Sequence, residues 1–156
     1  VRFLRGSTLR SIGDSAFLNC ESLRTVWLDA PVAEIGESAF MQCHNLRDLV
    51  FMDLDLVKRI GRQAFMFCSE LRQFTIPPLV PRIEPGTFHG CTSLTFLHIP
   101  AGVKLVCRHA FTQCDDLGKI IIDSDYTDLQ KGAFDPRTQL LREASDGSAV
   151  PADEEE

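Results

Sequence analysis

Hydrophobic residues recur along this chain at a fixed interval. Successive members of a phenylalanine column lie 23, 25, 23, 23 and 23 residues apart, at Phe17, Phe40, Phe65, Phe88, Phe111 and Phe134. A period of this length is typical of a solenoid, in which each repeat forms one coil and buries its apolar side against its neighbours. The pattern therefore predicts a stack of about six coils.

Other residue types keep step with the phenylalanines. Cysteine occupies the third position after them at Cys20, Cys43, Cys68, Cys91 and Cys114, and leucine the sixth at Leu23, Leu46, Leu71, Leu94, Leu117 and Leu140. Glycine precedes them by four positions at Gly13, Gly36 and Gly61, where we expect it to serve a bend. A further apolar column predicts a second short extended segment, at Leu9, Val32, Val57, Val80, Val103 and Tyr126.

Alternation of inward and outward residues follows each leucine, as in residues 23–28 and 94–99. This two-residue period predicts one half-buried strand per repeat, and strands that recur every 23 residues stack into a parallel sheet. The expected fold is an α/β-type leucine-rich-repeat solenoid of strand and coil, with only short 3-10 or helical turns on its outer side.

The regularity breaks at two places. The interval of 25 adds two residues in the region 52–56, which we expect to bulge outward as a solvated loop; a calcium loop built on Asp53 and Asp55 lacks the spaced ligands. The last repeat has Arg137 in place of cysteine and reads as a terminal cap, or as the place where structure ends. We therefore expect a solenoid over 1–142 and an acidic disordered tail over 143–156, with an acidic interaction tail as the alternative.

The motif Ile-Gly-x-x-Ala-Phe-x-x-Cys-x-x-Leu, followed by a strand that ends in Ile-Pro at 76–77 and 99–100, resembles the BspA-like leucine-rich repeats over residues 9–140. The resemblance implies a repeat protein that binds or adheres rather than catalyses. Members of that family bind unrelated partners, so it specifies the fold better than the function.

Charge argues against a nucleic-acid partner. The net charge is -6, but six of the 22 acids lie in residues 143–156, which leaves 16 acids and 16 bases in the body. A balanced body offers no broad basic surface for phosphates, and no apolar run reaches the roughly 20 residues that a membrane helix needs. We expect neither nucleic-acid binding nor membrane insertion.

Candidate chemistry is sparse. The repeating cysteines are expected to be buried, reduced thiols, whereas Cys107 lies outside their column and is expected to be an incidental surface thiol. Together with His109 and Cys114 it could form a partial metal site, but three scattered ligands favour the simpler interpretation. The sequence has no nucleophile elbow, P-loop or dinucleotide fingerprint, so we expect no catalysis, no cofactor and no metal.

Strand alternation identifies a candidate binding surface on the concave sheet. If Val26 and Leu28 face the core, the outward positions that we expect to contact a protein partner are Thr25, Trp27, Asp48, Val50, Met52, Thr75, Phe96, His98, Lys119 and Ile121. The alternative is that these are simply good strand residues. A column of Arg24, Arg47 and Arg72 would form a short basic ridge, either solvated or in contact with an acidic partner.

The sequence thus predicts a non-catalytic protein-interaction module of a larger protein or complex. The alternatives are a fragment of a surface adhesin and an architectural subunit of an assembly. Unpaired thiols and the absence of an Asn-x-Ser/Thr sequon favour an intracellular location over the cell surface.

Overall fold

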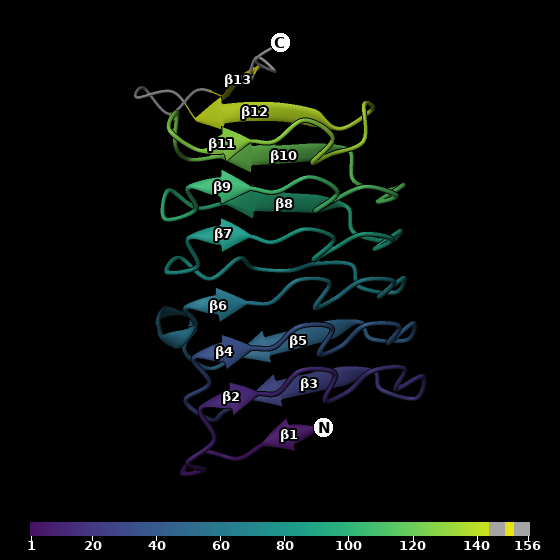
Figure 1. Cartoon of the computed structure of the whole chain (residues 1–156), viewed down its shortest axis with the longest axis vertical. Coiled ribbons are helices and arrows are strands. Elements are labelled where there is room, and N and C mark those ends of the chain that lie inside the picture. Colours follow the sequence, from purple (N-terminus) through teal and green to yellow (C-terminus); the bar gives the residue numbers. More distant parts are fainter. Residues whose placement is uncertain (144–148, 152–156) are drawn as a thin grey trace.

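The computed structural model describes residues 1–143 and 149–151 and shows a solenoid of stacked coils (Figure 1). We number the coils by their phenylalanine, from Phe17 in the first to Phe134 in the sixth. Each coil contributes a two-residue strand, an outer segment that holds the phenylalanine and, in five of the six coils, a longer strand. The predicted solenoid with one main strand per repeat is confirmed, apart from the third coil.

The longer strands form one face, which we call the long-strand face and which corresponds to the predicted concave sheet. Its strands are β1 (Arg2–Phe3), β3 (Thr25–Leu28), β5 (Asp48–Phe51), β8 (Phe96–Ile99), β10 (Lys119–Ile122) and β12 (Gln139–Glu143). All pairs among these strands are parallel, with Val26 beside Leu49 and Leu97 beside Ile120. Inward residues are aliphatic or aromatic and mostly buried, because each strand alternates its side chains between core and solvent.

The two-residue strands form a second, short-strand face. They are β2 (Ser11–Ile12), β4 (Glu34–Ile35), β6 (Arg59–Ile60), β7 (Arg82–Ile83), β9 (Leu105–Val106) and β11 (Asp128–Leu129). They confirm the predicted second extended segment, with one exception in the apolar column. Tyr126 is 88% exposed, and Thr127 fills the buried position instead and donates its hydroxyl to the Val103 carbonyl at 2.9 Å.

The outer segment of each coil hydrogen-bonds to the next coil through alternate residues. In the first coil, the N–H groups of Ser15, Phe17 and Asn19 donate to carbonyls of the second coil at 2.7–2.8 Å. Residues two before and two after the phenylalanine take a left-handed φ of about +54° to +75° in most coils. That conformation turns their N–H groups along the stack, and the fourth coil uses glycine there, at Gly86 and Gly90.

The phenylalanine column forms a continuous stack through the core. Consecutive rings lie 5.1–5.4 Å apart between centroids and within 10° of parallel. Phe40, Phe65, Phe88 and Phe111 are fully buried, and the ring of Phe74, from the third coil, packs against Phe65 and Phe88 with centroid distances of 5.0 and 4.8 Å. These rings supply much of the apolar burial that stabilises the coil stack.

The glycine column has a role that was not predicted. Gly36 and Gly61 have no positive φ, and a Cβ on either would lie about 2.6 Å from main-chain atoms of the preceding coil. These glycines therefore allow close approach between neighbouring coils. The bend itself stays a prediction, since the positive φ values of the turns belong to other residues of the outer segment.

Both sheets are interrupted at the third coil. The long-strand face divides into β1-β3-β5 and β8-β10-β12, and the short-strand face divides into β2-β4-β6 and β7-β9-β11. Residues 72–76, where a strand was predicted, belong to no strand, and within the described chain no main-chain N–H of these five residues donates a hydrogen bond; only the Arg72 carbonyl accepts one, from the Thr95 N–H at 3.4 Å. The coils stay joined there by the outer segment, since Phe65 N–H donates to Thr87 at 2.9 Å.

Prolines explain the interruption. Asp29, Met52 and Asp123 follow their strands and donate a main-chain N–H to the preceding coil at 3.0–3.1 Å, but the same position holds Pro77 and Pro100 around the third coil. On the short-strand face, Lys58 and Lys104 donate to the preceding coil at 2.8 Å, whereas Pro81 takes that position in the fourth coil. Because proline has no N–H, the ladder bonds at these points cannot form.

The two predicted irregularities behave differently. The extra residues form the outward 3-10 helix η1 (Leu54–Leu56), whose N-cap Asp53 accepts from the Asp55 N–H at 3.1 Å. In the last coil, Leu140 pairs with Ile120 rather than with Leu117, so its assignment to the leucine column was wrong. The sixth coil reaches its strand three residues early.

Four residues of the predicted disordered tail lie in strands, Glu143 at the end of β12 and the three residues of β13 (Ala149–Pro151). β13 pairs antiparallel with β12 and so covers its outer edge. The rest of the predicted acidic tail, residues 144–148 and 152–156, lies outside the described residues.

Candidate interaction surface

The long-strand face exposes large apolar side chains, as strand alternation predicts. Trp27 is 40% exposed, Val50 41%, Met52 58% and Phe96 46%, while Ile121 is half-buried. The register places the apolar Trp27 beside the apolar Val50, and His98 beside Ile121. The predicted surface therefore exists as a set of outward residues; its binding role is a proposal.

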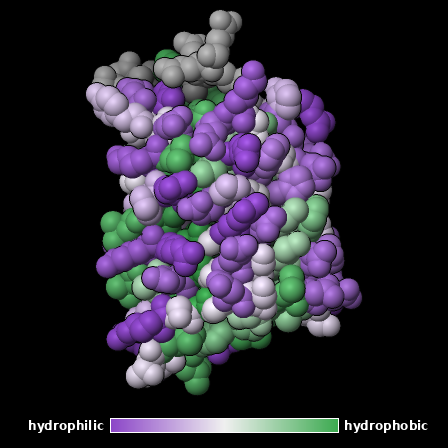
Figure 2. All heavy atoms as spheres, viewed as in Figure 1, coloured by the Kyte–Doolittle hydropathy of each residue, from purple (hydrophilic) through white to green (hydrophobic). Residues whose placement is uncertain are grey.

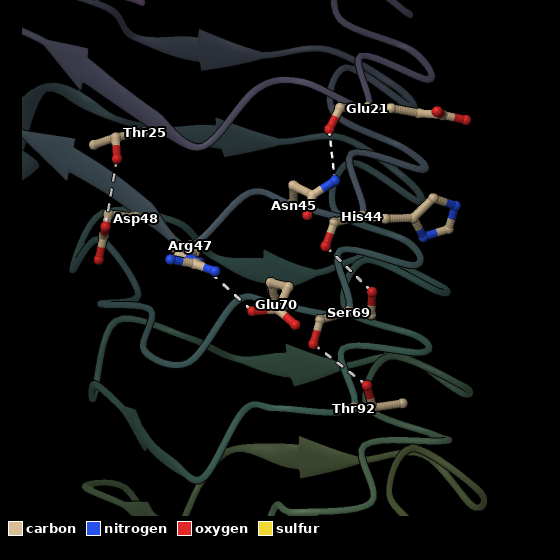
Figure 3. Close-up of polar contacts among 9 residues, drawn as sticks. All are labelled: Glu21, Thr25, His44, Asn45, Arg47, Asp48, Ser69, Glu70 and Thr92. Carbon is tan, nitrogen blue, oxygen red and sulfur yellow. Dashed lines mark hydrogen bonds and ion pairs between the residues drawn. The ribbon is translucent and has the colours of Figure 1, made fainter.

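Polar residues of the same face are linked between coils. The Thr25 hydroxyl donates to Asp48 at 3.5 Å (Figure 3), and His98 Nε2 lies 2.5 Å from Asp123 Oδ1. Thr75 and Lys119 are exposed. Arg2 holds Asp29 at 2.6 Å, which removes this outward carboxylate from solvent.

Two clefts open on either side of residues 73–75. One, of about 280 Å³, lies between β5 and the third coil and is lined by Asp48, Leu49, Val50, Phe51, Leu54, Gln73 and Thr75. The other, of about 370 Å³, lies on the β8 side and includes Phe96 and His98. Both follow from the unpaired third coil. Sequence reasoning missed them because the only signal was the position of Pro77 and Pro100 after their strands.

The predicted arginine column is present but is partly neutralised. Arg24, Arg47 and Arg72 are exposed, and Arg47 Nε lies 3.5 Å from Glu70 of the next coil (Figure 3). Short side-chain bonds run beside this column from coil to coil. Asn45 donates to the Glu21 carbonyl at 2.7 Å, Ser69 to the His44 carbonyl at 3.2 Å and Thr92 to the Ser69 carbonyl at 3.3 Å. The arginines thus lie beside a series of side-chain hydrogen bonds that connect successive coils.

The cysteines do not form a reactive or metal-binding site. Cys43, Cys68, Cys91 and Cys114 are buried, as predicted, but Cys20 is only half-buried. Cys107 is 2% exposed and accepts a hydrogen bond from Arg82 at 3.7 Å, so its assignment as a surface thiol was wrong. Across residues 1–143 and 149–151, no three or more His, Cys, Asp or Glu side chains are grouped to hold a metal ion.

Comparison with known proteins identifies the family. The chain matches the BspA type leucine-rich repeat region in six copies, over residues 4–87 and 58–142. The chain belongs to this family, and the resemblance noted in its sequence motif is confirmed. A comparison with curated proteins found no match. In the part of the chain that the structure describes, no helix is long and apolar enough to cross a bilayer.

Solved structures support the same assignment. A leucine-rich-repeat protein of T. pallidum is 28% identical with a TM-score of 0.68, over 76% of this chain and 54% of that one. A leucine-rich cell surface protein of Faecalibacterium prausnitzii A2-165 is 28% identical with a TM-score of 0.67, over 93% and 47%. One from Bacteroides ovatus ATCC 8483 is 28% identical with a TM-score of 0.70, over 90% and 38%. The chain thus spans about half of these proteins or less.

Proposed function

We propose that this chain is a non-catalytic protein-interaction module that binds a protein partner on its long-strand face. Leucine-rich repeats generally mediate protein–protein interaction or surface adhesion, and the chain belongs to that class. The observation that carries the proposal is the exposure of Trp27, Val50 and Phe96 on one face, where Trp27 and Val50 are neighbours in register and Phe96 lies on the other side of the third coil. Exposed aromatic and aliphatic groups gathered on one face are typical of contact sites.

The second candidate is a fragment of a surface adhesin. It is favoured by the Faecalibacterium prausnitzii structure, which is that of a leucine-rich cell surface protein and which this chain matches over 93% of its length. The same face would then contact a ligand outside the cell. An intracellular location remains the proposal drawn from the thiols, and the location of the full-length protein separates the two.

The test replaces the aromatic anchors of the face. The Trp27→Ser, Phe96→Ser double variant should lose capture of its partner in a pull-down. The two substitutions remove the aromatic contact groups, and they leave the buried core residues unchanged. Its unfolding free energy should stay within about 1 kcal/mol of the parent, since both residues are substantially exposed.

The matched control is Leu18→Ser, Tyr126→Ser. Both side chains are exposed and apolar but lie outside the long strands, in the outer segment and in a loop. This variant should capture the partner as the parent does. Capture that survives loss of Trp27 and Phe96 contradicts the proposal that these side chains anchor the partner.

A further inference from the structure

The cleft between β5 and the third coil is a feature that the regular repeat would not produce. In a regular coil, a strand would pair along β5, but Pro77 cannot donate the closing bond, and among the described residues no main-chain N–H of residues 72–76 donates to β5. The side of the β5 strand remote from β3 is therefore open. About 280 Å³ of space lies beside Val50, Leu54 and Thr75, which is room for side chains of a bound segment.

Acidic residues accompany this cleft: Asp48 lines it, and Asp53 and Asp55 are the chain neighbours of its lining residue Leu54. Asp48 begins β5, and Asp53 and Asp55 belong to the insertion that follows it. In the described residues none of these three carboxylates takes part in a salt bridge. The neighbouring Arg47 is engaged by Glu70 at 3.5 Å.

Apolar side chains line the cleft, and further exposed apolar side chains lie next to it. Val50 and Leu54 line the cleft, and Met52 and Leu56, which are 58% and 38% exposed, extend it outward. Figure 2 shows apolar side chains gathered along the edge of the molecule on which η1 lies in Figure 1, beside rows of hydrophilic side chains. The insertion therefore adds both apolar surface and negative charge at one place.

We propose that this cleft receives an extended segment of a protein partner that carries lysine or arginine on both sides of a short apolar stretch. The inference rests on the proposed protein-binding function and names the chemistry of the partner. The apolar stretch packs on Val50 and Leu54, and the two basic ends meet Asp48 and the pair Asp53 and Asp55. A segment with acidic ends would face like charges and gain nothing from the apolar contact.

The probe is a capped, fluorescein-labelled peptide, Lys-Thr-Leu-Val-Leu-Thr-Lys, titrated with the whole chain by fluorescence anisotropy. Two matched peptides test the two halves of the chemistry, one with glutamate at both ends and one with serine in place of the three apolar residues. The basic apolar peptide should bind at least ten-fold more tightly than either. Equal binding of the three peptides, or no binding of the first, overturns the inference.

Variants locate the site. Leu54→Ser and the double variant Asp53→Asn, Asp55→Asn should each weaken binding of the basic apolar peptide at least five-fold; asparagine keeps the N-cap of η1. The control Asp125→Asn, Asp128→Asn removes the same charge from exposed positions in the loop before β11 and in β11 itself. If both double variants weaken binding equally, the attraction is general and the cleft is not the site.

Two results separate this inference from the proposed function. If partner capture requires Trp27 and Phe96 but the peptide does not bind, the cleft inference alone fails. If the peptide binds at Leu54 while capture does not depend on Trp27 and Phe96, the cleft inference stands and the proposed role of these two aromatic anchors fails. A chain dimer in sedimentation that Leu54→Ser dissolves would make a second copy the occupant, and would overturn the partner chemistry.

Discussion

Four of the five repeating cysteines hydrogen-bond their coil to the previous one. The thiols of Cys43, Cys68, Cys91 and Cys114 donate to the carbonyl of a phenylalanine in the preceding coil at 3.0–3.3 Å. A small side chain with a weak donor suits this position, because it fills a buried space beside an accepting carbonyl. The column is thus a hydrogen-bonding element of the stack as well as part of its core.

Burial raises the pKa of these thiols, which makes stability depend on alkaline pH. The pKa of Cys43 rises to about 11 and that of Cys114 to about 12, and burial raises the pKa of Cys68 and Cys91 as well. The unfolded thiols titrate near 9, while the folded ones remain protonated. Their contribution is therefore fully present below pH 9 and declines as pH rises toward the folded pKa values.

Urea unfolding between pH 8 and 10.5 tests this linkage. Each buried thiol should lower the unfolding free energy by about 1.4 kcal/mol per pH unit above pH 9, because the unfolded state loses one proton that the folded state keeps. The Cys68→Ala variant should show a slope that is smaller by that amount. An unchanged slope would mean that Cys68 titrates in the folded protein as it does in the unfolded one.

Substitution of Gly102 should destabilise the protein, because the residue lies against the main chain of the previous coil. A Cβ at this position would overlap the Pro78 carbonyl oxygen of the previous coil, whereas a Cβ at Gly118 would meet nothing within 4 Å. We expect Gly102→Ala to lose about 1–3 kcal/mol of unfolding free energy, because main-chain atoms must move. Gly118→Ala should change it by less than about 0.5 kcal/mol in the same thermal or chemical denaturation series.

Single residues outside the strict columns were the hardest to predict. Cys107 stands in a glycine position and carries no periodic signal, yet it is buried beside Arg82. Thr127 occupies the buried position that was assigned to Tyr126, because its hydroxyl donates a hydrogen bond to the Val103 carbonyl. Spacing predicts which position faces the core, but where a polar residue can be satisfied by a neighbouring carbonyl, hydrophobicity alone selects the wrong one.

At the scale of elements, the third coil shows how proline decides pairing. Gly61 and Cys107 donate main-chain N–H groups to Ile35 and Ile83 of the preceding coil at 2.8–2.9 Å. Glu84 holds the same position in the fourth coil, but in the described structure its N–H makes no such bond, and Pro81 lies three residues before it. Because Pro81 has no main-chain N–H to donate, β6 and β7 do not pair.

Hydrogen exchange followed by NMR tests this account. In the parent, the Glu84 amide should exchange much faster than those of Gly61 and Cys107. Pro81→Lys, which copies Lys58 and Lys104, should slow Glu84 exchange by letting β6 and β7 pair. The unfolding free energy should change by less than about 1 kcal/mol, because the added hydrogen bond offsets the greater freedom of the unfolded chain.

The control for that experiment is Pro136→Lys, at an exposed proline of the sixth coil. It makes the same chemical change away from both ladders and should leave Glu84 exchange as it is. Slow exchange of Glu84 in the parent would show that the two short strands are already joined.

Element type was predictable here, but pairing was not. The two-residue period correctly indicated strands at 25–28, 48–51, 96–99 and 119–122, because inward and outward environments differ there. The same period indicated a strand at 72–76, where alternation is intact and only the following Pro77 signals a missing donor. The spacing from the phenylalanine column placed Leu140 in the wrong column. The last coil is shorter, so its hydrophobic residues are kept but their register is shifted.

At the scale of the whole molecule, the candidate surface was predictable because strand alternation determines which side chains face outward. The chain spans about half or less of the structures that it matches, so the surface described here is one part of the surface such proteins present. The clefts beside the third coil lay beyond sequence reasoning, since they arise from bonds that do not form. A partner that touches both β5 and β8 must cross this region.

The interruption of both ladders also has a mechanical meaning. A solenoid carries tension along its axis through the bonds between coils, and the third and fourth coils are joined mainly by the outer segment and by ring packing around Phe74. Each coil has a long-strand face, a short-strand face and an outer segment. Under a pull along the stack, hydrogen bonds of the outer segment carry most of the load between the third and fourth coils. The molecule should therefore yield first at this seam, as two stiff halves that part before either half unravels.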